Sequence, residues 1–386
     1  MRILKPDTAD DVRDAVRDAA QRATPLAVEG NGSKQGLGRR VEAETILKLS
    51  GLSGITMYEP DEMVFSARAG TTLEEIEATL NARGQCLGFE PGEIGPLWSA
   101  GAKATIGGTV AAAINGPRRF AAGAARDHLL GFSAVNGKGE PFKAGGRVVK
   151  NVTGYDLPKL AAGSFGTLFV MTELTLRAVP RGAAATVLGV ECLTPADALL
   201  LLRTVARSPF EPSGLAYLPA DASSRAGGRS QSQTLIRLEG QVEGVKAREA
   251  ELMRTWAKGA RVLDTKLFRA LTGVHTLFDA DSPLFRLSIP PSRASEAIDK
   301  LAPTSWFADG AGGILWLAFG ALDVERVHRT ARALDGHATL YRAPDTLREG
   351  DVFPPLDKAT LALTQQIKHA FDPSKILNPA RMYKGV

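Results

Sequence analysis

Residues 104–115 read Ala-Thr-Ile-Gly-Gly-Thr-Val-Ala-Ala-Ala-Ile-Asn, with small side chains at nearly every position. Small residues let backbones approach closely, and paired glycines let a flat ligand or a phosphate reach the main chain. Gly107 and Gly108 stand where a short helix is expected to begin, so we expect free backbone N–H groups to point outward there. A buried helix packed on a sheet, with Val110 and Ile114 toward the core, is the alternative that this stretch alone leaves open.

A second glycine-rich stretch, residues 30–38, contains four glycines and one asparagine and follows an expected short strand over residues 25–29. Consecutive backbone N–H groups in such a loop form a nest that binds anions, typically phosphate. Ser33 adds a hydroxyl group and Lys34 a positive charge. The loop leads into another expected strand rather than a helix, so it is not the dinucleotide-binding fingerprint of a doubly wound fold. A flexible turn is the other interpretation of this loop.

Composition limits the class of protein. The chain has 386 residues, 44% of them hydrophobic, and a net charge of +5 spread without blocks of like charge. Basic patches with interleaved aromatic residues are missing from the sequence, so we expect no nucleic-acid partner. Cys86 and Cys192 are the only cysteines, which excludes a cysteine-ligated iron–sulfur cluster within this chain and favours a reducing compartment.

The sequence pattern also predicts where the protein is found. The first residues carry no apolar signal core, and no stretch approaches the roughly 20 apolar residues of a membrane span. We therefore expect a cytoplasmic protein that reaches a membrane, the inner membrane in particular, only through partner subunits.

Local signals predict several element ends. Thr8 is a plausible cap for a helix over residues 8–23, and Thr71 with Glu74 fits a capping box for the next helix. The sequence Asn-Gly-Lys-Gly at residues 136–139 predicts a hairpin turn, because Asn-Gly tolerates positive φ.

The texture of the chain changes near residue 182. From there to about residue 345 the expected elements form two rounds of strand, helix, strand, strand, helix and strand, which predicts one antiparallel sheet covered by helices on one face. We expect an α+β protein in which residues 1–182, completed by the C-terminal segment 346–386, form one domain and residues 183–345 form a second. Ile376 and Leu377 are the expected anchors that pack the tail on the first domain.

Taken together, these segments resemble the vanillyl-alcohol-oxidase type of FAD flavoprotein, with its PCMH-type FAD-binding domain, and more closely the FAD-binding E subunits of bacterial glycolate oxidases. Any one motif is weak, but the set occurs in the family's order and spans nearly the whole chain. The matching stretches are Gly30–Lys34, Ala104–Ala111, Arg126–Gly131, Val149–Leu160, Gly163–Glu173 and Leu377–Arg381.

The resemblance implies two α/β subdomains that grip an extended FAD and a cap domain over the flavin. It assigns the pyrophosphate to the loop Gly30–Lys34, the ribityl chain and flavin to Thr105–Thr109, and the adenine end to Val170 and Glu173, with Asn378 reaching the flavin region. The expected cofactor-binding residues are Gly30, Asn31, Gly32, Ser33, Lys34, Thr105, Gly107, Gly108, Thr109, Val170, Glu173 and Asn378. Covalent members of the family often carry a histidine in the first loop, where this chain has Ser33 and Lys34, so we expect a non-covalent FAD.

The implied function is that of an FAD-binding subunit of a glycolate oxidase complex, which oxidises glycolate to glyoxylate and passes electrons to partner subunits. The expected partners are a catalytic flavin subunit and an iron–sulfur subunit. A stand-alone FAD-dependent dehydrogenase for 2-hydroxy acids or alcohols, and a flavin-bound scaffold without turnover, remain alternatives.

The sequence names no catalytic residue. Its five histidines, at positions 128, 275, 328, 337 and 369, are not spaced as neighbours on one helix face, so we expect no metal site. His128 lies inside the flavin-binding block and is either a cofactor contact or a hydrogen-bonded residue at a strand start. Arg118, Arg119 and Arg126 are either solvated or meet a phosphate or a substrate carboxylate. Lys150 and Tyr155 either support the fold or serve function.

Overall fold

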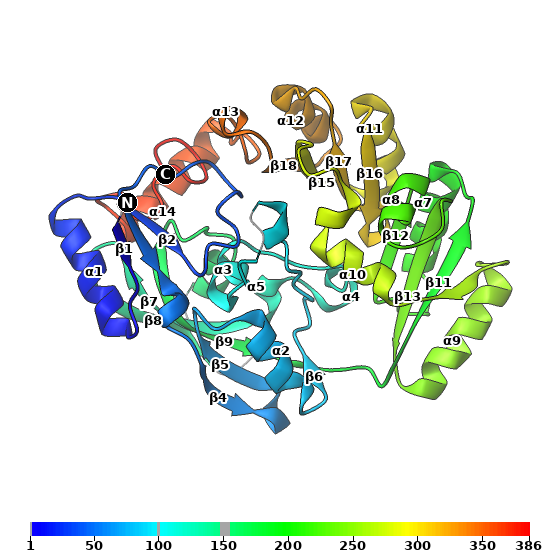
Figure 1. The fold of residues 1–386 in the computed structure, drawn as a ribbon, viewed down its shortest axis with the longest axis horizontal. Helices are drawn as coiled ribbons and strands as arrows, with labels where there is room; N and C mark the ends of the chain where they lie inside the picture. Colours follow the sequence, from blue (N-terminus) through cyan, green and yellow to red (C-terminus); the bar gives the residue numbers. More distant parts are fainter. Residues whose placement is uncertain (1, 99–100, 147–154) are drawn as a thin grey trace. The chain divides into compact units, whose positions relative to one another are not determined.

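The computed structural model describes residues 2–98, 101–146 and 155–386, so Lys150 and most of the motif around it lie outside the described residues. The chain divides into two compact units, drawn in Figure 1. The first unit consists of Met1–Ile114, Gly123–Pro180 and Pro355–Val386, and the second of Asn115–Ala122 and Arg181–Pro354. The α+β class expected from the sequence is confirmed.

The first unit is built on two main sheets. A three-stranded parallel sheet has the order β1-β3-β2, and a five-stranded antiparallel sheet has the order β4-β5-β9-β7-β8. Strands β6 and β10 form a separate two-stranded antiparallel sheet. The strands are β1 (Arg2–Leu4), β2 (Leu26–Glu29), β3 (Thr45–Lys48), β4 (Ile55–Glu59), β5 (Val64–Arg68), β6 (Gln85–Cys86), β7 (Leu129–Asn136), β8 (Pro141–Gly145), β9 (Phe169–Arg177) and β10 (Val179–Pro180).

Of the two helix caps predicted for the first unit, one is confirmed and one is wrong. Helix α1 (Ala9–Gln21) begins after Thr8, whose side chain accepts from the backbone N–H of Asp11 in a capping box, as predicted. Helix α2 (Leu73–Asn81) is capped by Thr72 rather than by Thr71. The Thr71 hydroxyl instead donates to the carbonyl oxygen of Arg68 at 2.7 Å, so the capping box predicted with Glu74 is wrong.

The core of the first unit brings α1, α2 and the short helix α3 (Ile106–Ala111) against the sheets. Apolar residues on one side of each helix are fully buried, as the helical spacing predicts. Phe132 and Phe169 stack in this core with ring centroids 5.0 Å apart. Two short helices, α5 (Ala125–His128) and α6 (Leu157–Ala161), lie between β-strands of the same unit.

The second unit is organised on one eight-stranded sheet with the order β14-β11-β13-β12-β16-β17-β15-β18. Every pairing within it is antiparallel, as predicted. Its strands are β11 (Ala184–Glu191), β12 (Gly214–Leu218), β13 (Gln233–Gly240), β14 (Arg261–Leu263), β15 (Leu284–Ser288), β16 (Ser305–Asp309), β17 (Ile314–Ala318) and β18 (His337–Arg342). Its helices are α4 (Arg119–Ala122), α7 (Pro195–Ala206), α8 (Ala220–Arg225), α9 (Val242–Thr255), α10 (Lys266–Gly273), α11 (Ala294–Leu301), α12 (Val324–Ala333) and α13 (Asp345–Arg348).

Helices cover both faces of this sheet. Phe285 of β15 contacts the ring of His328 on α12, with centroids 5.6 Å apart. The strand register places Arg237 of β13 on the opposite face, where its guanidinium lies 4.7 Å from the ring centroid of Phe268 on α10. The prediction that all helices share one face is therefore wrong for α10, because the hydrophobic pattern of a helix does not say which side of a sheet it covers.

The C-terminal tail completes the first unit. Helix α14 (Lys358–Phe371) leads into a segment that runs beside β2, where the backbone N–H of Leu26 donates to the carbonyl oxygen of Ile376 at 2.7 Å. Ile376 and Leu377 are buried. Among the described residues, every helix is too short or too polar to cross a lipid bilayer.

Candidate functional site

A cavity in the first unit brings together most of the residues that the sequence singled out. It holds about 710 Å³ of space that no atom fills, part of it open to solvent. Four segments form its wall: the end of β2 with the glycine loop, the start of α3, the turn before β9, and the C-terminal tail. The lining residues include 28–35, Thr105, Gly107, Gly108, Ala111, Ala112, Phe165, Gly166, 169–171 and Arg381.

The glycine loop needs its first glycine for close packing. A Cβ atom on Gly30 would lie 2.0 Å from the side-chain oxygen of Thr105, so only glycine lets the loop approach the start of α3. Gly32 has a φ of +83°, a left-handed conformation that glycine adopts at little cost. The loop is thereby held against α3 with its backbone toward the cavity.

Lys34 places a cation in this cavity. Its side chain is only 8% exposed, and among the described residues its ammonium makes one hydrogen bond, to the hydroxyl of Ser33 at 3.1 Å. Burial lowers the pKa of Lys34 to about 8, and the negative charge of Glu93 opposes that shift. Burying an ammonium whose N–H groups lack acceptors costs free energy, unless an anion accepts hydrogen bonds from them. The site therefore favours a ligand that carries negative charge.

The start of α3 differs from the prediction. The N–H of Gly107 donates to the carbonyl oxygen of Ala69 at 2.9 Å, and that of Gly108 donates to the side chain of Thr105 at 3.3 Å. Neither group is free, so the expectation of outward-pointing N–H donors is wrong. Gly107 serves close packing instead, because a Cβ on it would lie 2.8 Å from Ala69.

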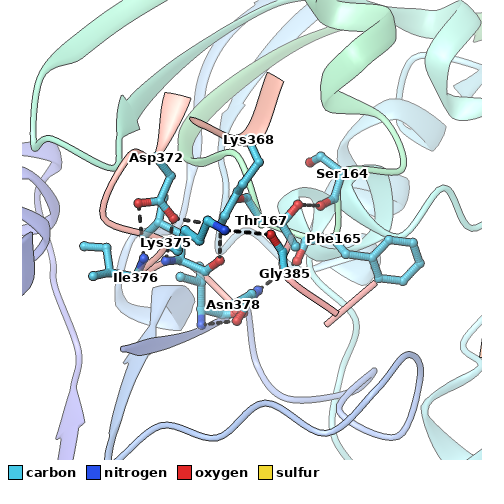
Figure 2. Close-up of polar contacts among 11 residues, drawn as sticks. Ser164, Phe165, Thr167, Lys368, Asp372, Lys375, Ile376, Asn378 and Gly385 are labelled. Atoms are coloured by element: carbon cyan, nitrogen blue, oxygen red, sulfur yellow. Dashed lines mark hydrogen bonds and ion pairs between the residues drawn. The ribbon is translucent and has the colours of Figure 1, made fainter. Parts of the chain in front are cut away.

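The tail holds two walls of the cavity through Asn378. Its amide oxygen accepts from the N–H of Val28 at 2.7 Å, and its amide nitrogen donates to the carbonyl oxygens of Val28 and Phe165 at 3.2 and 2.8 Å (Figure 2). Asn378 is 1% exposed and does not line the cavity. Arg381 does line it, and its guanidinium donates to the carbonyl oxygens of Lys34 and Leu37 at 2.8 and 2.9 Å.

A buried ion pair between Lys368 and Asp372 anchors the tail close to Asn378. The Lys368 ammonium donates to the Asp372 carboxylate at 2.7 Å and to the carbonyl oxygens of Thr167 and Leu377 at 2.6 and 2.9 Å (Figure 2). The carboxylate also accepts from the N–H groups of Ile376 and Leu377. All three ammonium donors have acceptors, which is the condition under which a buried charge pair is tolerated.

Three of the predicted cofactor residues lie off the cavity wall. Asn378 stands behind it, as described. Thr109 is fully buried, and its hydroxyl has no partner among the described residues. Glu173 lines a different hollow of the first unit, together with Arg13, Arg68 and residues of β7 and β8. Nine of the predicted residues line the cavity: Gly30, Asn31, Gly32, Ser33, Lys34, Thr105, Gly107, Gly108 and Val170.

The other singled-out residues have different positions. His128 is fully buried at the end of α5, 5.7 Å from the ring of Phe89, and does not line the cavity. Arg118 lies in the second unit, where its guanidinium pairs with Glu239 at 2.8 Å. Arg126 is largely exposed beside Asp127, and Tyr155 is 96% exposed. Among the described residues, no cluster of three or more His, Cys, Asp or Glu side chains is arranged to hold a metal.

Sequence reasoning missed the residues that hold the cavity together. The sequence motif that contains Arg381 gives that residue no role, and no local pattern distinguishes Lys368, Asp372 or Phe165. A lysine and an acid four residues apart in the last turn of a helix was the available signal, but that spacing is common on solvated helix faces. Only tertiary burial distinguishes this pair.

The cavity fits an extended dinucleotide cofactor of the FAD type. Backbone of the glycine loop lines it, the Lys34 ammonium supplies a positive charge with unused hydrogen-bond donors, and Val28, Ala111 and Val170 supply apolar surface. Pyrophosphate would accept charge-assisted hydrogen bonds from the ammonium, and the aromatic rings of the cofactor would pack on the apolar walls.

Comparisons with known proteins agree with this geometry. Residues 2–145 match the family model described as an FAD binding domain. Over 378 residues the chain is 35% identical to the glycolate oxidase subunit GlcE of Escherichia coli K12, covering 98% of each protein. It is also 30% identical to a D-lactate dehydrogenase of Archaeoglobus fulgidus over 56% of this chain and 47% of that protein.

Solved structures share the fold at low sequence identity. A p-cresol methylhydroxylase superposes with a TM-score of 0.72 at 15% identity, covering 98% of this chain and 88% of that one. An alkyldihydroxyacetonephosphate synthase gives the same TM-score at 16% identity over 98% of this chain and 77% of that one. The PCMH-type FAD-binding fold expected from the sequence is thereby confirmed.

Proposed function

The chain belongs to the family of FAD-linked oxidoreductases that includes the glycolate oxidase subunit GlcE, and from that premise we propose that it is the FAD-binding subunit of a complex that oxidises glycolate to glyoxylate. The match over 98% of both proteins supports the assignment to this subunit type rather than to a shared domain alone. The observation in the structure that supports it best is the buried Lys34 ammonium, which faces a glycine-lined cavity with donors to spare.

In this proposal the FAD pyrophosphate lies on the loop from Gly30 to Lys34, with the Lys34 ammonium as its counter-charge. Thr105 and Gly108 flank the cofactor at the start of α3, and Val170 packs against its apolar part. Asn378 and Arg381 hold the cavity walls in position. Asn378 bonds to Val28 and Phe165, and Arg381 bonds to Lys34 and Leu37. The side-chain atoms that make these bonds do not donate to the cofactor. The FAD is held without a covalent bond.

Bound flavin supplies the capacity to accept a hydride from the carbon that bears the substrate hydroxyl. The chain's own residues orient the cofactor, exclude water from its apolar side and neutralise its phosphates. In this proposal Lys34 serves the phosphate end and is not the general base. We therefore assign no catalytic residue within this cavity.

The electrons leave through other subunits. The two cysteines, Cys86 and Cys192, are too few to hold an iron–sulfur cluster. We propose that a catalytic flavin subunit and an iron–sulfur subunit complete the complex and carry its association with the inner membrane, while this chain itself is cytoplasmic.

The first experiment is a visible spectrum of the purified chain, before and after denaturation and filtration. Flavin bands whose chromophore passes the filter support a dissociable FAD. Bands that stay with the polypeptide contradict the non-covalent assignment. A chain that takes up no flavin even from excess FAD contradicts the proposed function.

A second experiment separates a subunit from a complete enzyme. Glycolate oxidation with an artificial electron acceptor is measured for the isolated chain and after addition of its partner subunits. Activity that requires the partners supports the proposal. Turnover by the isolated chain would instead identify a stand-alone dehydrogenase for 2-hydroxy acids or alcohols.

A further inference from the structure

The eight-stranded sheet of the second unit ends differently at its two edges. At one edge lies β18, where the N–H of Leu340 donates to the carbonyl oxygen of Val352 at 2.8 Å, so a later segment of the chain covers the strand. At the other edge lies β14, which pairs with β11 and with no other segment of the described chain. An edge strand without a neighbour presents N–H and C=O groups that can pair with another chain.

Apolar side chains are exposed at the β14 edge. Helix α9 packs against β11 beside this edge (Figure 1) and ends at Trp256, which is 40% exposed although its ring packs edge-on against Phe210. Val262, in the middle of β14, is 59% exposed. Leu263 instead packs directly on β11, because a Cβ on Gly189 would lie 2.2 Å from its side chain. The strand is thereby anchored on one side and leaves Val262 available on the other.

Basic side chains flank this edge. From Lys258 to Arg269 the sequence has four basic residues and one acidic residue, Asp264, whose carboxylate lies 3.7 Å from the Lys266 ammonium. Lys258, Arg261 and Arg269 are exposed, and within the described part of the chain their side chains make no hydrogen bond or ion pair. The edge therefore carries positive charge that attracts an acidic segment.

The same charges decide which chain can pair with the edge. If β14 paired with β14 of a second copy, arginines at position 261 would approach each other, and like charges on neighbouring strands destabilise a sheet. Arg261 and Val262 are adjacent in the strand, so their side chains point to opposite faces. A strand that alternates acidic and apolar residues would match both, with carboxylates beside Arg261 and apolar groups beside Val262.

We propose that β14 is a docking edge for an extended acidic segment of a partner subunit, which joins the sheet as a further strand. Main-chain hydrogen bonds supply the affinity of such a contact, and the alternating side chains supply its specificity. Arg261 selects the acidic residues of the segment and Val262 the apolar ones. Because a partner is expected only for a subunit of a complex, the inference rests on the proposed function.

The first test is amide hydrogen exchange of the full chain, measured alone and with its purified partner subunits added. Exchange at residues 261–263 is expected to slow by about tenfold or more on assembly, because unpaired N–H groups of the edge become hydrogen-bonded. Strand β15, which already has a neighbour on each side, is the internal control and is expected to exchange alike in both samples. Exchange at residues 261–263 that assembly leaves unchanged overturns the proposal.

The second test is charge reversal at the edge. Arg261→Glu is expected to weaken association with the partner subunits by about tenfold or more, most strongly at low salt, because attraction becomes repulsion. Arg329→Glu is the matched control, since Arg329 is exposed on α12, which packs against the opposite edge strand β18. Circular dichroism with thermal unfolding establishes that both variants are folded. An Arg261→Glu chain that associates as tightly as the parent chain overturns the proposal.

These readouts do not depend on flavin. If the subunits assemble through β14 but the chain takes up no FAD, the docking edge stands and the proposed function fails. If FAD binds and the assembled complex oxidises glycolate while Arg261→Glu changes neither assembly nor turnover, the function stands and the docking edge fails. An isolated parent chain that sediments as a dimer, which Arg261→Glu converts to a monomer, overturns the proposal in favour of a second copy.

Discussion

The ammonium of Lys368 lies 2.7 Å from the carboxylate of Asp372, with both side chains fully buried. The pair joins the last turn of α14 to the segment that runs beside β2, and the same ammonium holds the carbonyl oxygen of Thr167 just before β9. One buried charge therefore ties the C-terminal tail to a wall of the cofactor cavity more than 200 residues away in sequence.

Lys368→Met is expected to destabilise the first unit by about 3–5 kcal/mol, because it leaves the Asp372 carboxylate buried without its cation. The measurement is the free energy of unfolding from a urea titration. Lys358→Met, at the exposed first residue of the same helix, is the control and is expected to change it by less than about 0.5 kcal/mol. A loss below about 1 kcal/mol for Lys368→Met would show that the site relaxes to admit water.

Asn378→Ala is expected to weaken FAD binding without removing any atom from the cavity wall. The variant leaves the N–H of Val28 and the carbonyl of Phe165 without their buried partner, at about 1–3 kcal/mol each. We expect the Kd for FAD, measured by flavin fluorescence, to rise about tenfold or more.

The control for this experiment is Asn81→Ala at the exposed end of α2, which is expected to leave the Kd unchanged. An Asn378→Ala protein that is folded and binds FAD as tightly as the parent would exclude a positioning role for the tail. Direct contact between Asn378 and the flavin, expected from the resemblance, predicts in addition a shift of the flavin absorption bands in any variant that still binds.

Which features could be predicted from sequence depended on how far apart the interacting groups lie in the chain. Thr8 caps α1 as predicted, because its partner Asp11 is three residues away. Thr71 and Thr72 are each followed three residues later by a glutamate, so no local pattern separates them. The choice is made by a tertiary contact, since the Thr71 hydroxyl is used by the carbonyl oxygen of Arg68.

The site follows the same rule. The glycine loop and the start of α3 were recognisable because glycine spacing constrains the backbone locally. The bonds of Asn378 to Val28 span 350 positions, and those of Arg381 to Lys34 span 347. Likewise, the N–H of Gly107 is taken by Ala69 of another segment, which no helix-start pattern reveals.

Gly30→Ala is expected to abolish FAD binding at cofactor concentrations that saturate the parent chain. The new Cβ would lie 2.0 Å from the Thr105 side-chain oxygen, so either the loop or the start of α3 must move. Adding Thr105→Ala removes that oxygen and is expected to restore part of the affinity, a coupling that a double-mutant cycle measures. Gly244→Ala, on α9 where no atom lies within 4 Å, is the control.

The Arg118–Glu239 ion pair of the second unit predicts a stability change in acid. Although burial opposes ionisation, the Arg118 hydrogen bond and the charge of Arg237 lower the pKa of Glu239 to about 2. A carboxylate with a depressed folded pKa stabilises the protein above its ordinary value of 4.5, and that stabilisation is lost as pH falls from there toward 2. In the Glu239→Gln variant, the free energy of unfolding should depend less on pH in this window. An unchanged pH dependence would assign the acid sensitivity to other groups.

Lys34 predicts that FAD affinity depends on pH. Burial lowers its pKa to about 8 in the cofactor-free chain, so the ammonium is mostly charged at pH 7 and mostly neutral at pH 9. Pyrophosphate binds the charged form and raises the pKa, so the Kd for FAD should rise above pH 8 with a slope approaching about tenfold per unit. Lys34→Arg, which does not titrate in this range, should lose the slope while still binding, and Lys34→Met should bind weakly at every pH. A parent chain whose Kd is the same at pH 7 and 9.5, or a Lys34→Met chain that keeps the slope, would place the phosphates away from this side chain.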